Sequence, residues 1–251
     1  MDYISILRKM VGARALVTYD RRRKFILPYV KNKKVLDVGF VGGDWRFAES
    51  AVMLSTLHFQ LAKCARETVG IDLNIKGLTL MKKRYAGLNL FAADAYSLPF
   101  KDETFDLIVT GDLLEHLGNA GIFLDEINRV LTNNGCLVGT VPNAWNSTGL
   151  ISLLFRIQPT PSRDSTHVHI FDDWTLSLLF LQHNFEARII HLPHEHFFLR
   201  FVEKIIPKTA PILGFVAKKI LRSYAQEQLR NLIKKLEKKV SARLKGIGVT
   251  G

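Results

Sequence analysis

The sequence predicts an α/β fold in which a mostly parallel, seven-stranded sheet is covered by helices on both faces. Short, continuously apolar runs alternate with longer helix-like runs over most of the chain, and strands of that kind are typical of parallel sheets buried on both sides. The composition, 47% hydrophobic and 23% charged residues, indicates a globular chain with a substantial core. A length of 251 residues suffices for one large α/β domain with a modest appendage.

Seven apolar runs are predicted to be strands, and most of the longer runs to be helices. The predicted strands lie at residues 35–38, 68–71, 90–93, 105–109, 136–141, 187–192 and 212–217. The predicted helices lie at residues 44–65, 75–84, 122–131 and 173–181, with a partly helical stretch at 194–208. Asp172 or Asp173 is the expected N-cap of the helix at 173–181, because an aspartate side chain accepts hydrogen bonds from a first helical turn.

Two predicted segments flank this alternating region. Residues 1–34 look helical and basic, and they precede a predicted domain at 35–219. Residues 220–251 form a predicted basic tail, helical over 220–245, in which apolar side chains recur every three or four positions and so share one face. These apolar side chains are Ala225, Leu229, Leu232, Leu236, Val240 and Leu244.

The predicted tail carries much of the charge of the chain. Between residues 220 and 245, eight lysines and arginines stand against two glutamates, a net charge of +6 out of +12 for the whole chain. A solvated helix packed on the domain and a helix that contacts a membrane surface or a partner both fit this pattern. The overall charge indicates an anionic partner, such as nucleic acid, a phosphorylated substrate or an acidic membrane surface.

Several protein classes are not expected from this sequence. No uninterrupted apolar stretch reaches the length of a membrane-spanning helix. The N-terminal residues lack the clean apolar core of a secretory signal. Cys64 and Cys136 lie far apart without metal-type spacing, as expected for two thiols in a reducing compartment. The sequence therefore predicts a cytoplasmic protein.

Glycines and acidic residues follow the first four predicted strands. They are the loop Gly39-Phe40-Val41-Gly42-Gly43, then Asp72, then Asp94-Ala95, and then Gly111. Because ligands bind beyond the carboxyl ends of parallel strands, these residues are expected at one edge of the sheet. Glycines let a ligand approach the backbone, and one carboxylate can accept hydrogen bonds from two ribose hydroxyls. The series predicts a pocket for an adenosine-bearing ligand.

The glycine loop does not fit a dinucleotide or a P-loop. A dinucleotide loop requires G-x-G-x-x-G, but Val41 replaces the second glycine and Asp44 the third. A pyrophosphate needs backbone amides at close range, which a β-branched residue obstructs. No G-K-[ST] sequence follows any predicted strand, so a P-loop is excluded as well.

The ordered series of motifs resembles class I S-adenosylmethionine-dependent methyltransferases, in the group that includes the ubiquinone and menaquinone methylases. The resemblance covers about residues 25–219, and its motifs read KKVLDVGFVGG, VGIDLN, FAADAYSLPFKDETFDLIVTGDLLEHL, NGCLVGTVPN and THVHIFDDWTLSLLFLQHNFEARII. It implies a Rossmann-like, three-layer αβα sandwich and S-adenosylmethionine as the cofactor. The family usually has glycine at the position of Val41.

The resemblance also implies roles for single residues. Gly39 and Gly43 are expected along the methionine part of the cofactor, with Asp37 ordering their loop. Asp72 is expected to bind the ribose hydroxyls, and Asp94 with the backbone of Ala95 to bind the adenine. The other residues expected to contact the cofactor or to border its sulfonium are Phe40, Gly42, Leu73 and Gly111.

Methyl transfer from a sulfonium is an in-line displacement, so much of its rate can come from alignment. A hydroxyl acceptor additionally needs a base, for which histidine suits neutral pH. His116, after the fourth predicted strand, and His167 are the predicted catalytic residues, and His169 alternates with His167. Packing roles for these histidines remain open. No metal is predicted, because the remaining cluster of His191, His194, Glu195 and His196 lacks a defined ligand spacing.

The acceptor is predicted from what surrounds these motifs. Base-amine methylases generally carry [Asp/Asn/Ser]-Pro-Pro-aromatic after the fourth strand, where this chain has Thr110-Gly111-Asp112-Leu113. Apolar residues at Trp145, 150–155 and 197–201 suit a hydrophobic acceptor. The prediction is methylation of an oxygen or carbon, less so a nitrogen, of a small-molecule or lipid-linked acceptor, with residues 220–245 at the inner face of a membrane. An RNA methyltransferase and a non-catalytic binding protein with this fold are the alternatives.

Overall fold

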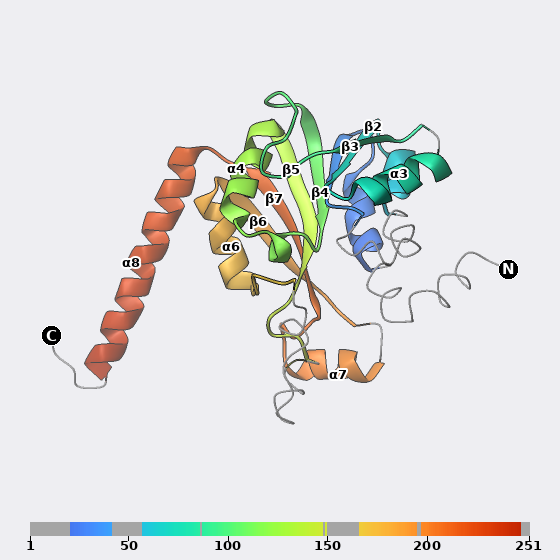
Figure 1. The fold of residues 1–251 in the computed structure, drawn as a ribbon. Helices are drawn as coiled ribbons and strands as arrows, with labels where there is room; N and C mark the ends of the chain where they lie inside the picture. Colours follow the sequence, from blue (N-terminus) through green and yellow to red (C-terminus); the bar gives the residue numbers. More distant parts are fainter. Residues whose placement is uncertain are drawn as a thin grey trace.

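The computed structural model describes residues 21–41, 57–85, 87–147, 149, 166–194 and 197–246. Its centre is a seven-stranded sheet with the strand order β3-β2-β1-β4-β5-β7-β6, and helices lie on both sides of it (Figure 1). The neighbouring pairs among β1 to β5 are parallel, whereas β7 runs antiparallel to both β5 and β6. The predicted α/β fold with a mostly parallel sheet is confirmed.

The strands agree with the predicted runs and extend most of them. Their bounds are β1 Lys34–Val38, β2 Glu67–Asp72, β3 Asn89–Ala92, β4 Phe105–Gly111, β5 Leu131–Pro142, β6 Phe185–Leu192 and β7 Ile212–Lys219. The largest difference is at the start of β5, which begins five residues before the predicted 136. Its first residue pairs with Phe105, and the register shifts before the next pair, Leu107 with Cys136.

The helices also follow the predicted pattern. Their bounds are η1 Leu27–Tyr29, α3 Ile75–Arg84, η3 Leu114–His116, α4 Ala120–Val130, α6 Asp173–Gln182, α7 Phe197–Ile205 and α8 Arg222–Gly246. Residues 21–26 and 57–64 are helical too, while the rest of the predicted helices at 1–34 and 44–65 lies largely outside the described residues. Asp172 is the N-cap of α6, where its side chain accepts a hydrogen bond from the backbone of Thr175 and completes a capping box.

Alternating side chains of the central strands belong to two hydrophobic clusters. Leu36 and Ile108 pack with α4 and α6, whereas Val35 and Leu107 pack with residues 26–30 and 57–61. Since successive side chains of a strand point to opposite faces, the two clusters cover opposite sides of the sheet. A third cluster packs α3 beside the loop that follows β1.

The strand order reverses between β1 and β4, which are neighbours in the sheet although two strands separate them in the chain. The carboxyl ends of both strands meet at this switch point, where open α/β sheets bind their ligands. The loops after β1, β2, β3 and β4 therefore lie along one edge. Of the described helices, α8 contacts α6 near its first turns and then extends away from the rest of the molecule (Figure 1).

Candidate active site

The loop after β1 turns at Gly39, which has a left-handed φ of +72°. Its backbone N–H donates to the carbonyl of Ile71, at a distance of 2.9 Å. A Cβ at this position would lie 2.8 Å from a methyl group of Leu113. The backbone conformation therefore favours glycine, and any larger residue would also have to displace the Leu113 side chain. Gly42 and Gly43, the other predicted cofactor glycines, lie outside the described residues.

Val41, the departure from the family pattern, points into the protein. Its side chain is 2% exposed and packs with Leu78 and Met81 of α3. A Cβ on Gly77 would lie 2.1 Å from a Val41 methyl carbon, so the glycine in α3 provides the room for the valine. The Val41 N–H donates to Asp72 at 2.8 Å. The buried valine side chain therefore does not obstruct the side of the loop that would face a ligand.

Asp37, at the end of β1, contacts a histidine that the sequence analysis did not select. His58 is fully buried, and its Nδ1 lies 3.0 Å from the Asp37 carboxylate. The imidazole stacks on Phe40 with ring centroids 4.5 Å apart, over Gly70, where a Cβ would meet both rings. The available signal in the sequence was the helical spacing of Leu57 and Leu61, which flank His58 and are both buried in the structure. The pair holds the carboxylate and the loop in fixed orientations.

Asp72, at the end of β2, accepts hydrogen bonds from the loop and from its own turn. One carboxylate oxygen accepts from Val41 and the other from the backbone of Asn74, each at 2.8 Å. A carboxylate has about four lone-pair sites, so this arrangement is compatible with ribose hydroxyls as further donors. Leu73 directly follows and is 71% exposed, so it adds an apolar surface beside the acid.

Asp94 lies in the turn after β3, where its carboxylate accepts from the backbone N–H of Tyr96 at 2.9 Å. Ala95 packs against the main core cluster. The following segment is tied to α4 by Arg129, which donates to the carbonyls of Leu98 and Phe100. The same guanidinium binds the carboxylates of Glu126 and Asp102.

The ion pairs of this network shift the pKa values of both partners in α4. The side-chain hydrogen bond from Arg129 holds the pKa of Glu126 below its ordinary value, and the reciprocal bond raises the pKa of Arg129. Glu126 also accepts from the backbone N–H of Leu98 at 2.7 Å. These contacts fix the segment that follows the predicted adenine-binding turn.

The end of β4 combines an open glycine with a charged pair. A Cβ on Gly111 would meet only the Arg22 side chain among the described residues, at 3.8 Å, so there is room beside this residue. Asp112 has a left-handed φ of +49° and forms an ion pair with Arg22. Its carboxylate also accepts from the Thr140 hydroxyl at 2.7 Å, which joins β4 to β5.

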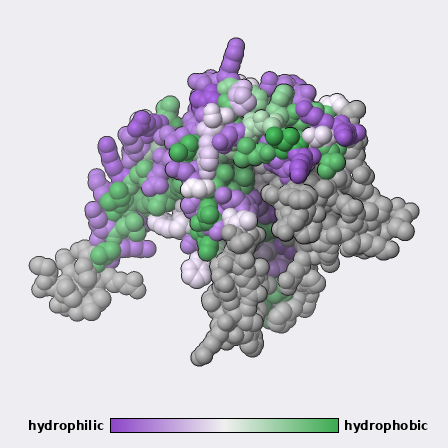
Figure 2. All heavy atoms as spheres, viewed as in Figure 1, coloured by the Kyte–Doolittle hydropathy of each residue, from purple (hydrophilic) through white to green (hydrophobic). Residues whose placement is uncertain are grey.

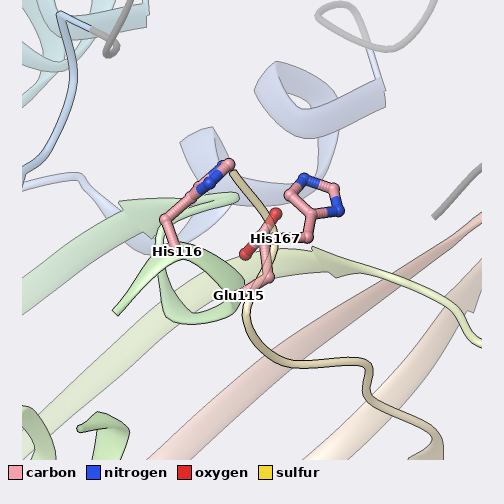
Figure 3. Close-up of side chains that lie close together, drawn as sticks. All are labelled: Glu115, His116 and His167. Carbon is pink, nitrogen blue, oxygen red and sulfur yellow. The ribbon is translucent and has the colours of Figure 1, made fainter. Parts of the chain in front are cut away.

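Three side chains with acid–base chemistry come together directly after β4 (Figure 3). Glu115 and His116 belong to η3, and His167 belongs to a segment fifty residues later. One carboxylate oxygen and one ring nitrogen from each histidine lie within 4.8 Å of one another. The two predicted catalytic histidines are therefore neighbours, with ring centroids 4.7 Å apart. Glu115 was not predicted.

The other predicted histidine cluster is divided between two acidic partners. His194 Nδ1 lies 2.5 Å from Glu203 of α7, and His191 Nε2 lies 3.8 Å from Asp173 of α6. Glu195 and His196 lie outside the described residues. These pairs make structural links between β6 and the two helices.

Two described parts of the predicted apolar acceptor surface are exposed, one in the turn after β5 and one on α7. Trp145 is 55% exposed, and its indole N–H donates to Asp172 at 3.2 Å. Phe201 of α7 is 53% exposed. Residues 150–155 lie outside the described residues. Burial raises the pKa of Asp172, but hydrogen bonds from Thr175 and Trp145 outweigh it and hold the pKa below its ordinary value.

A family model described as a methyltransferase domain matches residues 53–139. A demethylmenaquinone methyltransferase of Staphylococcus aureus is 34% identical over 111 residues, which cover 43% of this chain and 42% of that protein. A probable S-adenosylmethionine-dependent methyltransferase of Mycobacterium tuberculosis is 28% identical over 105 residues, which cover 42% of this chain and 34% of that protein. The chain is a relative of class I S-adenosylmethionine-dependent methyltransferases. The aligned region spans less than half the length of these curated relatives.

Solved methyltransferase structures share the fold. An S-adenosylmethionine-dependent methyltransferase from Archaeoglobus fulgidus superposes with a TM-score of 0.58 at 21% identity, covering 87% of this chain and all of the other. The putative methyltransferase of Haloferax volcanii in a complex with its Trm112 activator superposes with a TM-score of 0.60 at 13% identity, covering 87% and 96%. At these identities the likeness establishes the Rossmann-like methyltransferase fold.

S-adenosylmethionine is the cofactor that a methyltransferase domain of this kind implies. The described residues fit it. The carboxylate of Asp72 lies beside the exposed residue Leu73. An adenosine needs such a pair, a polar group for its ribose hydroxyls and an apolar group for its ring. Among the described residues, the space beside Gly111 lies at the end of β4, the strand that precedes His116 in the chain.

Proposed function

We propose that this chain transfers the methyl group of S-adenosylmethionine to an oxygen or carbon atom of a small-molecule or lipid-linked acceptor. The observation that carries the proposal is the adjacency of two groups of residues at one sheet edge. Cofactor-type residues follow β1 to β3, and Glu115 and His116 follow β4, where His167 of a later segment joins them. The edge includes the switch point of the strand order, where such sheets bind ligands.

The proposed cofactor contacts are those expected from the sequence. Asp72 binds the ribose hydroxyls, Asp94 with the backbone of Ala95 binds the adenine, and Leu73 packs on the ring. Asp37 acts through the loop, since its carboxylate contacts His58. The remaining proposed contacts are Gly39, Phe40, Gly42, Gly43 and Gly111. We assign these contacts to a methyltransferase domain at 35–219, flanked by the segments 1–34 and 220–251.

The proposed chemistry needs alignment and, for a hydroxyl acceptor, removal of a proton. The S–CH3 bond of the cofactor breaks as the new bond to the acceptor forms, and sulfur keeps the electron pair. Glu115 and His116 follow β4, His167 lies beside them from a later segment, and all three are proposed to act on the acceptor hydroxyl. An acceptor with activated carbon would depend on the same residues for its orientation.

The acceptor is proposed to be apolar over much of its surface. The relative from Staphylococcus aureus is named for demethylmenaquinone, a small hydrophobic molecule. In this chain the exposed apolar residues include Trp145, Phe201 and Ile205 of α7, and Ile206 directly after that helix. They support a hydrophobic small molecule or lipid more than a nucleic acid.

The tail is proposed to hold the enzyme at an anionic membrane surface. Ala225 in the first turn of α8 is 1% exposed, whereas Leu236 and Val240 on the same apolar face are exposed. Apolar and hydrophilic surface alternate along this helix in Figure 2. An amphipathic helix with basic flanks binds such surfaces by burying its apolar face. No described helix combines the length and apolarity needed to cross a membrane.

Titration calorimetry of the untagged chain with S-adenosylmethionine tests the proposed function. We expect saturable binding at micromolar to low millimolar cofactor, followed by release of S-adenosylhomocysteine when a total lipid extract is added. Absence of binding at millimolar cofactor would contradict the proposal and favour a non-catalytic binding protein. Methylation of RNA, with binding that weakens steeply as salt rises, would instead support the RNA methyltransferase alternative, which the net charge of +12 favours.

Vesicle cosedimentation tests the membrane contact. Phosphatidylglycerol vesicles are expected to bind the chain more strongly than phosphatidylcholine vesicles. Leu236→Glu should abolish most of that binding, because it places a charge on the exposed apolar face. Asn231→Glu is the matched control, since it adds the same charge at an exposed position outside the apolar series. Equal binding of both variants would contradict the proposed contact.

A further inference from the structure

We propose that Glu115, His116 and His167 form a binding site for one divalent first-row transition-metal ion. Among the described residues, this is the group of three whose ligand atoms come together, within 4.8 Å of one another. Ligand atoms bonded to one such ion lie roughly 3–4 Å apart, as follows from bonds of about 2.0–2.2 Å. Small side-chain rotations therefore suffice to bring the three atoms onto an ion.

The fold holds the two halves of the site together by backbone hydrogen bonds. The carbonyl of Glu115 accepts from the N–H groups of Val168 and His169, at 2.8 and 3.1 Å. The segment around His167 is thus fixed against η3, at the carboxyl end of β4. The alternation of exposure along residues 166–170 directs His167 and His169 inward and Val168 outward. The ligands are positioned before any ion arrives.

A hydrogen bond selects the ring nitrogen of His116 that can bind an ion. Its Nδ1 lies 3.2 Å from the carbonyl oxygen of Thr166, which can only accept, so Nδ1 carries the proton. The neutral ring then has its lone pair on Nε2. Metal-binding histidines generally have this arrangement, in which the second ring nitrogen donates to a carbonyl or carboxylate and fixes the tautomer.

The donor set indicates the class of ion. Two imidazole nitrogens and one carboxylate oxygen suit Zn²⁺, Mn²⁺ or Fe²⁺, whereas Mg²⁺ prefers oxygen donors and retains its waters. Glu115 is 1% exposed, so an ion bound to its carboxylate would be shielded from solvent on that side. Both histidines are partly exposed, so an ion held there would keep coordination positions open toward solvent or a substrate.

The surrounding charges do not preclude a cation. Arg22 lies next to this strand end, but its guanidinium forms an ion pair with Asp112. The described histidines farther from this edge contact other acids: His183 contacts Asp125 at 2.7 Å, and His194 contacts Glu203. These pairs provide control positions with the same side-chain chemistry outside the proposed site.

The role of the ion rests on the proposed function, although ion binding itself does not. A hydroxyl group of the acceptor bound at an open position would lose its proton to water more readily, because the ion stabilises the resulting oxyanion. That oxygen would then form the new O–CH3 bond while the S–CH3 bond of the cofactor breaks. S-adenosylhomocysteine and a methylated hydroxyl are the products. The histidines would act as ligands, and the ion would take the place of a general base.

Binding of Co²⁺ and Zn²⁺ to the untagged, chelator-treated full chain tests the site without cofactor or acceptor. We expect one Co²⁺ per chain with visible d–d absorption, displaced by Zn²⁺. Glu115→Gln and His167→Asn should each weaken binding by about tenfold or more, as the loss of a ligand requires. His183→Asn should bind as the original chain does, and Mg²⁺ should not compete.

Two results would overturn the proposal. One is the absence of stoichiometric Co²⁺ or Zn²⁺ binding to the original chain at micromolar to millimolar ion. The other is ion binding that remains unchanged in Glu115→Gln, His116→Asn and His167→Asn. If Glu115→Gln fails to fold because its glutamate is buried, the two histidine variants alone test the site. Cofactor affinity is measured on the same samples. Ion binding without cofactor binding would support the metal site and contradict the proposed function, and the reverse result would do the opposite.

Discussion

The two halves of the candidate site are held together in different ways. After β2 and β3, the acids Asp72 and Asp94 accept hydrogen bonds from backbone groups two residues ahead, so short turns set much of their orientation. After β4, the carbonyl of Glu115 binds a segment more than fifty residues later. The cofactor half is thus largely a property of the sheet edge and its turns, whereas the acceptor half exists only once distant segments have packed.

Replacing the histidines of the acceptor half should give the largest effect, a loss of turnover without a loss of cofactor affinity. His116→Asn or His167→Asn is expected to lower turnover by about a hundredfold or more, because each removes a group proposed to act on the acceptor hydroxyl, either directly or as an ion ligand. The affinity for S-adenosylmethionine should change by less than about twofold. The measurements are release of S-adenosylhomocysteine with a total lipid extract, and titration calorimetry with the cofactor.

The control for this prediction is His191→Asn. Its histidine lies on β6, an edge strand of the sheet, near Asp173 of α6, and the substitution should leave turnover unchanged. If the two site variants lost cofactor affinity in parallel with turnover, the division of the edge into two halves would be wrong. Equal turnover in all three variants would remove the histidines from the proposed chemistry.

This contrast explains what the sequence could predict. Strand ends and turn residues are local signals, so the positions of Asp72, Asp94 and Gly111 followed from the order of apolar runs. The contact between His116 and His167 depends on which loop covers the end of β4, and no periodicity encodes that. Both histidines could be selected by residue type, but their pairing, and the participation of Glu115, required the tertiary structure.

The same limit applies to Val41 and His58. The valine looked like an obstruction in a glycine loop, but its side chain packs in the space that Gly77 of α3 leaves open. That compensation joins residues thirty-six positions apart, so the local motif alone could not reveal it. His58 likewise sits on a buried helix face, and its partner Asp37 lies on the neighbouring strand. Only the folded chain pairs them.

Gly39→Ala should give the second-largest effect, by disturbing the point where the two halves touch. A Cβ there would combine a φ of +72° with a 2.8 Å approach to Leu113. We expect the free energy of unfolding to fall by about 2 kcal/mol, the sum of a left-handed alanine and a displaced core side chain. Urea denaturation measures it, with cofactor affinity recorded on the folded variant.

Gly87→Ala is the matched control for that substitution. Gly87 has a similar φ of +86°, but a Cβ there would meet no atom of the described residues within 4 Å. The substitution should cost only the conformational part, about 1 kcal/mol. Equal losses in the two variants would show that the contact between the loop after β1 and Leu113 contributes nothing to stability.

Asp72→Asn should weaken the cofactor half alone. The substitution keeps the side-chain shape but removes the charge that accepts from Val41 and from the proposed ribose hydroxyls. We expect about a tenfold loss of S-adenosylmethionine affinity, in line with hydrogen bonds to charged groups. Asp106→Asn, at the opposite end of β4, removes an ion pair with Arg66 and should leave the affinity unchanged. Equal losses in both variants would count against the ribose role.

Mild acid should give the smallest effect, through the contact between α4 and the segment after Asp94. The hydrogen bond from Arg129 lowers the folded-state pKa of Glu126 below its unfolded value of roughly 4.3. A depressed carboxyl pKa stabilises the fold above the unfolded pKa, and this contribution is lost as the pH falls through the folded value.

The stability difference between the original chain and Glu126→Gln should therefore be constant near neutrality and shrink below about pH 4.3, by no more than about 1 kcal/mol. Urea denaturation at a series of pH values measures this difference, and a difference that grew in acid would reverse the assigned sign. Because this network fixes the segment that follows the turn of Asp94, S-adenosylmethionine affinity should fall over the same range. The contact of His116 with the Thr166 carbonyl involves neither Glu126 nor Arg129.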